Sequence, residues 1–301
     1  MIRILVMAIA SGTLAFTAVA IDARCACAHG TIGGYTFLEP IVAEDANPKN
    51  EFAIARPSWV RTSEGREFAL GFSLEKKLSE NSSIVLGSAW VESSPKEEHS
   101  ASGFENMEVL LKYAFYTNDE HQFRLSAALG MDMPVGNPSI GAETHFRMGP
   151  EVLWAKGMGD LPNDNPILRY LRPIGFQGDV GYSANTSGVA VHDLVADELI
   201  EYSIPYLSNS VHDFGLPWPI RNMYLYTEFN YDQLLAGPSG QTFPQIRITP
   251  GLAFMNRSLE LSVATQFPLN NATVPENHAV VLGLVDLFID DLIPATNWTP
   301  F

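Results

Sequence analysis

The chain has 301 residues, of which 46% are hydrophobic, and a formal net charge of −16 from 34 acidic and 18 basic side chains. So acidic a chain has no surface suited to neutralising phosphates, which excludes nucleic acid as a partner. No linker or low-complexity tract divides the sequence, and we therefore expect one large domain. No run of about twenty apolar residues occurs beyond the N-terminus, which excludes a helical membrane protein.

Residues 1–28 have the pattern of a secretory signal peptide. Arg3 supplies the positive charge, residues 4–20 form the apolar stretch, and Ala26-Cys27-Ala28 is a cleavage site of small residues. An uncleaved membrane anchor is the alternative, but the stretch is short for a spanning helix and rich in small residues, which favours cleavage. Cleavage would remove both cysteines, so we expect neither a disulfide nor thiol chemistry in the mature protein.

Residues 29–50 are predicted to be an irregular N-terminal segment, because they contain Pro40, Pro48 and a polar run over residues 43–47. This segment could be a lead-in to the first strand or a plug. Residues 51–61 alternate loosely around Pro57 and are predicted to form that first strand.

The pattern that organises the chain begins in residues 66–91, where two alternating segments are joined by a polar turn at residues 78–81. Phe68, Leu70 and Phe72 point to one side of the first segment, and small or charged residues point to the other. This period of two predicts an antiparallel hairpin with one apolar face. Since the other face lacks bulky groups that could pack a second sheet, the pattern is typical of a transmembrane β-barrel.

Similar alternation recurs along the rest of the chain. The segments are residues 107–116, 122–132, 143–154, 174–183, 222–233, 245–254 and 258–267. Residues 92–106 are predicted to be a polar loop, residues 190–200 could form a short helix, residues 198–207 a strand, and residues 278–289 a strand that is apolar on both faces. We therefore predict an all-β fold, a single antiparallel transmembrane barrel of about 10–12 strands over residues 51–289, with 12 preferred and residues 290–301 as a C-terminal tail.

Three stretches resemble a known family. They are Glu75-Lys76-Lys77-Leu78-Ser79-Glu80-Asn81, Asp290-Asp291-Leu292-Ile293-Pro294 and Tyr35-Thr36-Phe37-Leu38-Glu39-Pro40. Together they are similar to an uncharacterised proteobacterial outer-membrane β-barrel family, related to the transporter-like proteins named for the MetA pathway of phenol degradation. These motifs mark strands and turns, so the resemblance implies location and fold rather than an activity.

Charged residues on the inward face are the candidate functional residues. We predict that the pore is lined by Glu67, Glu108, Lys112, Arg124, Asp132, Arg147, Glu151, Asp179, Glu228, Asp232, Arg247 and Glu260. Some pairs, such as Glu108 with Lys112, are expected to neutralise each other, but the surplus is acidic and predicts a weak preference for cations. The lipid-facing side chains are predicted to include Phe68, Leu70, Phe72, Phe123, Leu125, Leu129, Ile246 and Leu261.

The sequence contains no convincing catalytic, cofactor or metal site. His145, Arg147 and Glu151 form a loose polar group that we interpret as part of a pore wall. The Asp and Asn side chains of residues 160–165 could offer oxygen ligands, but they lack the spacing of a calcium loop and are better explained as turn residues. We expect neither an enzyme nor a cofactor.

The expected function is an outer-membrane channel or transporter-like barrel for the passive passage of small solutes in a Gram-negative bacterium. Its expected partners are the outer-membrane bilayer, the barrel-assembly machinery and small solutes. Three alternatives stay open: a structural or adhesive outer-membrane barrel without conductance, a soluble secreted β-sandwich that binds a ligand, and an outer-membrane hydrolase, which would need an inward nucleophile and base. A sandwich would need large apolar residues on its buried face.

Overall fold

A computed structural model describes residues 30–61, 65–96, 99–237, 244–270, 279–293 and 298–300. The predicted signal peptide, residues 1–28, lies outside these ranges. No helix in the described ranges is long and apolar enough to span a bilayer.

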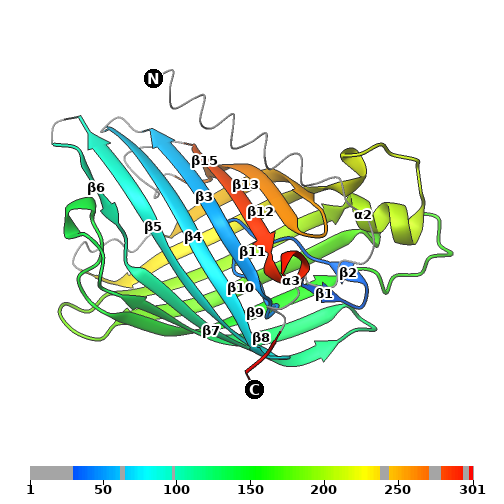
Figure 1. Cartoon of the computed structure of the whole chain (residues 1–301), viewed down its shortest axis with the longest axis horizontal. Coiled ribbons are helices and arrows are strands. Elements are labelled where there is room, and N and C mark those ends of the chain that lie inside the picture. Colours follow the sequence, from blue (N-terminus) through cyan, green and yellow to red (C-terminus); the bar gives the residue numbers. More distant parts are fainter. Residues whose placement is uncertain are drawn as a thin grey trace.

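The described strands form one closed antiparallel barrel (Figure 1). Its twelve strands are β3 (Glu51–Arg61), β4 (Gly65–Ser79), β5 (Ser82–Pro95), β7 (Met107–Asn118), β8 (Phe123–Met133), β9 (Arg147–Gly157), β10 (Ile174–Asn185), β11 (His192–Ser203), β12 (Met223–Ala236), β13 (Gln245–Met255), β14 (Leu259–Pro268) and β15 (Val280–Phe288). Each strand pairs with its neighbours in the sequence, and β15 closes the barrel against β3, with Val281 opposite Trp59. The predicted single all-β barrel is confirmed, with twelve strands.

Shorter elements lie at the two ends of the barrel. They are β1 (Thr31–Ile32), β2 (Tyr35–Thr36), β6 (Ala101–Phe104), η1 (Pro138–Ile140), η2 (Leu168–Leu171), α2 (Ile204–Tyr206), η3 (Leu207–Val211), η4 (Ile220–Asn222) and α3 (Ile289–Leu292). We call the end at which β3 begins and β15 ends the terminal end. The hairpin of β1 and β2 and the helix α2 lie there, while β6 lies at the opposite, distal end (Figure 1).

Three sequence predictions were wrong in detail. Residues 190–200 are not helical, and most of them belong to β11, which begins at His192. The strand expected over residues 198–207 stops at Ser203, directly before α2. The region expected to be a polar loop, residues 92–106, instead contains the end of β5 and the short strand β6, which pairs with β5.

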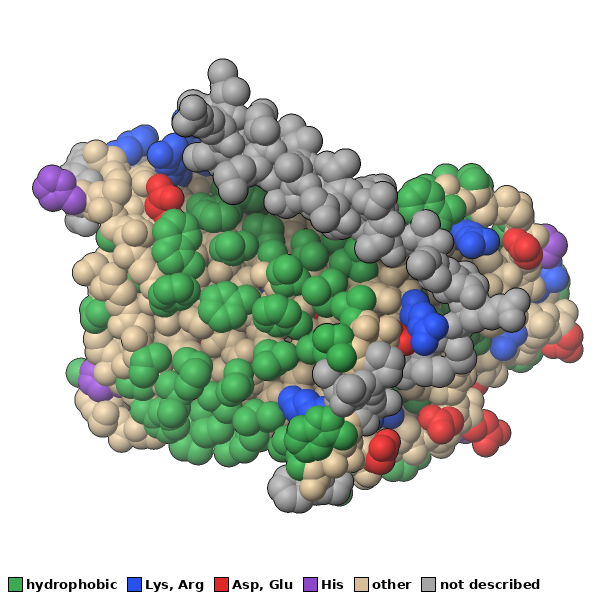
Figure 2. Space-filling view, in the orientation of Figure 1, with side chains coloured by type: hydrophobic (Ala, Val, Ile, Leu, Met, Phe, Trp, Pro, Cys, Tyr) green, Lys and Arg blue, Asp and Glu red, His purple; other side chains and the backbone are tan. Residues whose placement is uncertain are grey.

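The outer surface of the barrel is apolar. Leu70, Phe72 and Leu261 are each more than a third exposed, although they are large hydrophobic side chains. Figure 2 shows such side chains gathered over the middle of the strands, with charged side chains mainly towards the ends. A closed barrel with an apolar band on the outside is suited to a lipid bilayer, because every strand is paired and no edge meets hydrocarbon.

The two faces of β4 should differ in their tolerance of charge. Phe72→Arg would place a cation in the apolar band and should destabilise the barrel by about 2–4 kcal/mol if Phe72 lies near the bilayer midplane, whereas Glu67→Arg, on the opposite face, should have an effect of about 0.5 kcal/mol or less. Refolding into lipid vesicles across a urea series measures both. Equal destabilisation by the two substitutions would show that the outer face of β4 does not contact lipid.

Candidate functional site

The inner face of the barrel carries an unusual number of buried carboxylates. Glu75, Glu201, Glu228, Glu260 and Asp286 are each at most 3% exposed. Burying an ionised carboxylate is costly unless hydrogen bonds or opposite charges compensate it. The groups that compensate these carboxylates therefore identify what the lumen is built to hold.

The N-terminal segment, residues 37–50, occupies the terminal half of the lumen. It has no helix or strand of its own and runs inward from the hairpin of β1 and β2 before returning to the start of β3. Its residues Phe37 and Leu38 are almost completely buried. Leu38 packs in a cluster with Leu199 and Phe288 from the barrel wall. Of the two predicted alternatives for this segment, the structure therefore shows a plug within the lumen rather than a lead-in outside it.

Glu228 is the central acceptor for this plug segment. Its carboxylate accepts hydrogen bonds from three successive backbone N–H groups, those of Ile41 at 2.8 Å, Val42 at 2.9 Å and Ala43 at 2.9 Å. Hydrogen bonds to an ionised acceptor are stronger than neutral ones. One carboxylate on β12 thus fixes the innermost turn of the segment.

Other wall carboxylates hold the segment before and after this turn. The backbone N–H of Leu38 donates to Glu201 at 3.1 Å, that of Glu39 to Glu260 at 3.0 Å, that of Glu44 to Asp179 at 2.9 Å and that of Lys49 to Glu75 at 3.2 Å. Each acceptor stands on a different strand. These four wall carboxylates therefore bind the backbone of the segment.

A buried cluster of charges secures the C-terminal part of the segment. The ammonium group of Lys49 lies 2.9 Å from carboxylate oxygens of both Asp45 and Glu51, and it also contacts Glu39. Glu39 accepts a second bond from Arg56 of β3 at 2.6 Å. Burial opposes the charge on Lys49, but the surrounding carboxylates outweigh it and raise the pKa of Lys49 well above its usual value.

The hairpin of β1 and β2 packs against the connections at the terminal end. The Tyr35 hydroxyl donates to the Pro173 carbonyl at 2.7 Å, and the ring of Tyr35 lies 5.1 Å from that of Tyr206 in α2. The side chain of Gln122, in the turn between β7 and β8, donates to the Gly33 carbonyl at 3.0 Å. The hairpin therefore sits over the mouth that the plug segment enters.

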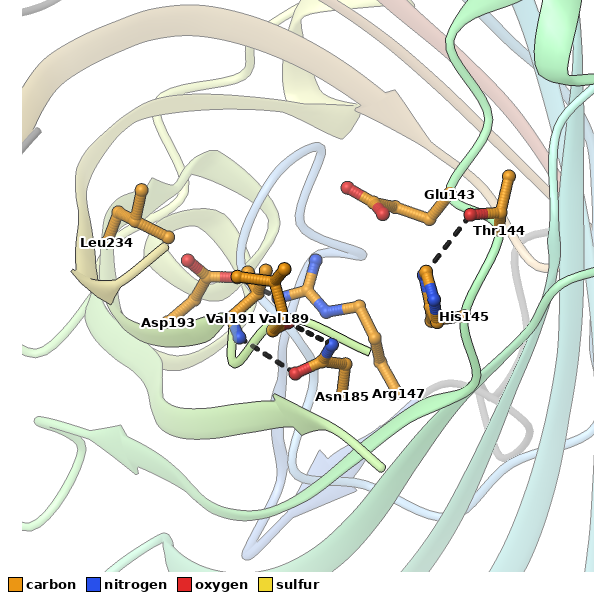
Figure 3. Close-up of a pocket in the computed structure, with 9 residues that line it drawn as sticks. All are labelled: Glu143, Thr144, His145, Arg147, Asn185, Val189, Val191, Asp193 and Leu234. Carbon is orange, nitrogen blue, oxygen red and sulfur yellow. Dashed lines mark hydrogen bonds and ion pairs between the residues drawn. The ribbon is translucent and has the colours of Figure 1, made fainter. Parts of the chain in front are cut away.

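The distal half of the lumen contains open space. A cavity of about 530 Å³ is lined by Glu143, Thr144, His145, Arg147, Asn185, Val189, Val191, Asp193 and Leu234 (Figure 3). A smaller cavity of about 190 Å³ lies between the wall residues Glu151, Asp179 and Asp197 and the plug residues Val42 and Glu44. We call these two cavities, which lie between the distal end and the plug segment, the vestibule.

The structure places all twelve predicted pore-lining residues on the lumen side of the wall, at two levels. Five lie at the level of the plug segment: Lys112, Arg124, Asp179, Glu228 and Glu260. The other seven lie on the same lumen face but nearer the distal end: Glu67, Glu108, Asp132, Arg147, Glu151, Asp232 and Arg247.

The expected neutral pair of Glu108 with Lys112 was wrong. Lys112 instead pairs with Glu75 at 3.4 Å, while Glu108 lies directly opposite Asp132 on β8. Arg147 pairs with Asp193 of β11. Lys112 and Arg147 are therefore neutralised by carboxylates, and acidic residues outnumber basic ones among the seven distal residues.

Several lumen residues were missed by the sequence prediction. Asp193, Asp197 and Glu201 lie on β11, which was expected to be partly helical, and Asp286 lies on β15, whose faces could not be distinguished. The first three share odd-numbered positions, but Val195 and Leu199 at the odd-numbered positions between them are apolar and obscure the pattern. Among the described residues, no group of three or more His, Cys, Asp and Glu side chains has an arrangement that could hold a metal ion.

These features define a class, the outer-membrane-type β-barrel with a polar lumen. Two solved structures share its architecture. The COG4313 outer membrane channel from Pseudomonas putida F1 has a TM-score of 0.53 and 11% identity, over 84% of this chain and 100% of that chain. A NanC porin has a TM-score of 0.50 and 10% identity, over 78% of this chain and 98% of that chain. At such identities the similarity shows the fold alone.

No protein-family model matches the sequence, and no curated protein matches it. The particular function therefore has to be argued from the lumen.

Proposed function

We propose that this protein is a channel of the Gram-negative outer membrane that lets small solutes pass by diffusion. The observation that carries the proposal is the inverted distribution of polarity, with an apolar outer band and a charged inner wall leading to an open vestibule. A soluble β-sandwich would have its large apolar side chains inside and does not fit this arrangement. The channel and porin with the same architecture support the proposal.

The rest of the proposed biology follows from an outer-membrane barrel. The signal peptide would be cleaved on export, and the barrel-assembly machinery would insert the folded strands into the bilayer. We propose no catalytic role for the vestibule, in which Arg147 is held in an ion pair with Asp193. The solute class would be set by charge and size.

The vestibule should favour cations. Glu108 lies opposite Asp132, Glu151 lines the smaller cavity, and the Arg147 charge is balanced by Asp193. An unpaired negative wall raises the local concentration of cations, and salt near 1 M, where the Debye length is about 3 Å, screens that effect.

We therefore expect a cation-selective reversal potential across a gradient of dilute KCl in a planar bilayer, fading as the salt concentration rises. Asp132→Asn should reduce the preference, because it removes one charge from the vestibule without touching the plug segment. Anion preference in the unmodified protein would contradict the proposed role of the wall.

A second candidate function is a structural barrel without conductance. The observation that favours it is the plug segment, whose buried backbone fills the terminal half of the lumen. The two candidates differ in whether that segment ever leaves its place. Bilayer recordings without a single conductance step, from protein that is demonstrably folded, would favour the structural barrel.

A further inference from the structure

The contacts between the plug segment, residues 37–50, and the barrel wall would allow the segment to leave the lumen. The barrel strands pair with one another around the full circumference without help from this segment. Most of the plug segment's hydrogen bonds with the wall carboxylates use its backbone N–H groups, which water can satisfy equally well once the segment leaves. Removal of the segment would therefore leave a complete barrel.

The same contacts determine what the emptied lumen would bind. Glu75, Asp179, Glu201, Glu228 and Glu260 would lose their N–H donors, and Lys112 is the neighbouring wall cation that pairs with one of them. Carboxylates that lose donors in a narrow lumen attract cations. Backbone N–H groups and cations are alternative partners for the same acceptors.

We infer that residues 37–50 are a reversible plug, and that the five carboxylates that hold its backbone form the cation-binding ring of the open channel. The inference rests on the proposed channel function and adds to it both a gate and the site that selects the solute. Release would occur towards the terminal end, where the segment is tethered to β3 at Glu51 and where the hairpin of β1 and β2 must move aside.

A reversible crosslink tests the gate. Ser126 of β8 donates its hydroxyl to the Ala46 carbonyl at 2.5 Å, and both residues are buried, so Ala46→Cys with Ser126→Cys should join the plug to the wall under oxidation. The two natural cysteines lie at positions 25 and 27, within the predicted signal peptide. We expect KCl conductance to disappear on oxidation and to return on reduction.

Glu228→Gln gives a test without cysteines. It removes the charge and replaces one of the two accepting oxygens with an NH2 group that cannot accept, and we expect the ratio of open to closed time to rise about tenfold. Asp232→Asn is the matched control, since it removes a carboxylate from the same face of β12 beyond the plug. The control should lower cation preference and leave the open fraction unchanged.

Deletion of residues 37–49 separates the gate from the channel. We expect a constantly open barrel, and Glu260→Gln in that background should reduce its cation preference because the ring then faces the permeating ions. Equal conductance of the oxidised, reduced and deleted forms would overturn the gate while leaving the channel intact. No conductance from the folded deletion variant would overturn the proposed channel itself. Unchanged selectivity after Glu260→Gln would overturn the ring.

Discussion

A chain that ends before Ala279 should fail to form a barrel. The missing strand, β15, pairs with β14 along one side and with β3 along the other, so its loss exposes two unpaired edges. Unpaired backbone groups in hydrocarbon cost several kcal/mol each, and a closed barrel is one of the few structures that avoid them. Refolding in detergent followed by protease digestion measures the result, and we expect no protected fragment.

The matched control is a chain that ends at Pro294, which keeps β15 and α3. Among the described residues that it lacks is Trp298, whose carbonyl accepts a hydrogen bond from Lys76 at 2.7 Å and whose ring lies 5.0 Å from the same ammonium group. These exposed contacts contribute little to the wall, so assembly should be largely retained. Failure of this longer chain would instead identify residues 295–301 as an assembly signal.

Lys49→Met should dislodge the plug while leaving the barrel folded. The substitution removes the cation that compensates the buried carboxylates of Glu39, Asp45 and Glu51. Removal of one partner from a buried charge cluster costs about 3–5 kcal/mol, because the remaining charges stay desolvated. The docked state of the segment bears this cost, since in the released state these carboxylates can be hydrated.

Limited proteolysis measures the consequence. Cleavage within residues 37–50 should become much faster in Lys49→Met, while the strands stay protected. Lys77→Met is the control, because the ammonium group of Lys77 pairs with the highly exposed Glu80 and exposed pairs contribute little. Unchanged cleavage in Lys49→Met would show that the charge cluster does not hold the segment in place.

The barrel could be predicted from the sequence because its wall follows a period of two. In β8, Leu125 and Leu129 face outward while Arg124 and Ser126 face the lumen, as the alternation indicated. A sheet with one apolar and one polar face can be predicted without knowledge of contacts between distant parts of the chain. The fold class and the twelve inward-facing residues were accessible for that reason.

The region of β11 could not be predicted from the same signal because both of its faces are mixed. Leu199 faces the lumen, where it packs with Leu38 of the plug, and Glu198 lies on the opposite face, where Trp154 donates its indole N–H at 3.1 Å. Each residue breaks the alternation for a reason that lies elsewhere in the chain. An apolar residue on the polar lumen face, such as Leu199, is explained only by the plug residue that packs against it.

The path of the plug was inaccessible for a related reason. Most of its contacts with the wall carboxylates run through backbone N–H groups, which every non-proline residue has, so no side-chain motif marks them. Pro40 and Pro48 indicated only that residues 29–50 are irregular. The excess of acidic residues on the inward face was visible in the sequence. It indicated a pore wall that attracts ions, and it gave no sign that these carboxylates accept hydrogen bonds from the backbone of the plug segment.

Cell fractionation with gel electrophoresis before and after boiling is the most direct test that this chain is an outer-membrane barrel. A closed barrel with every strand paired should resist SDS at room temperature, so the protein should appear in the outer-membrane fraction and migrate differently once boiled. Recovery in the soluble periplasmic fraction, with the same migration before and after boiling, would contradict it.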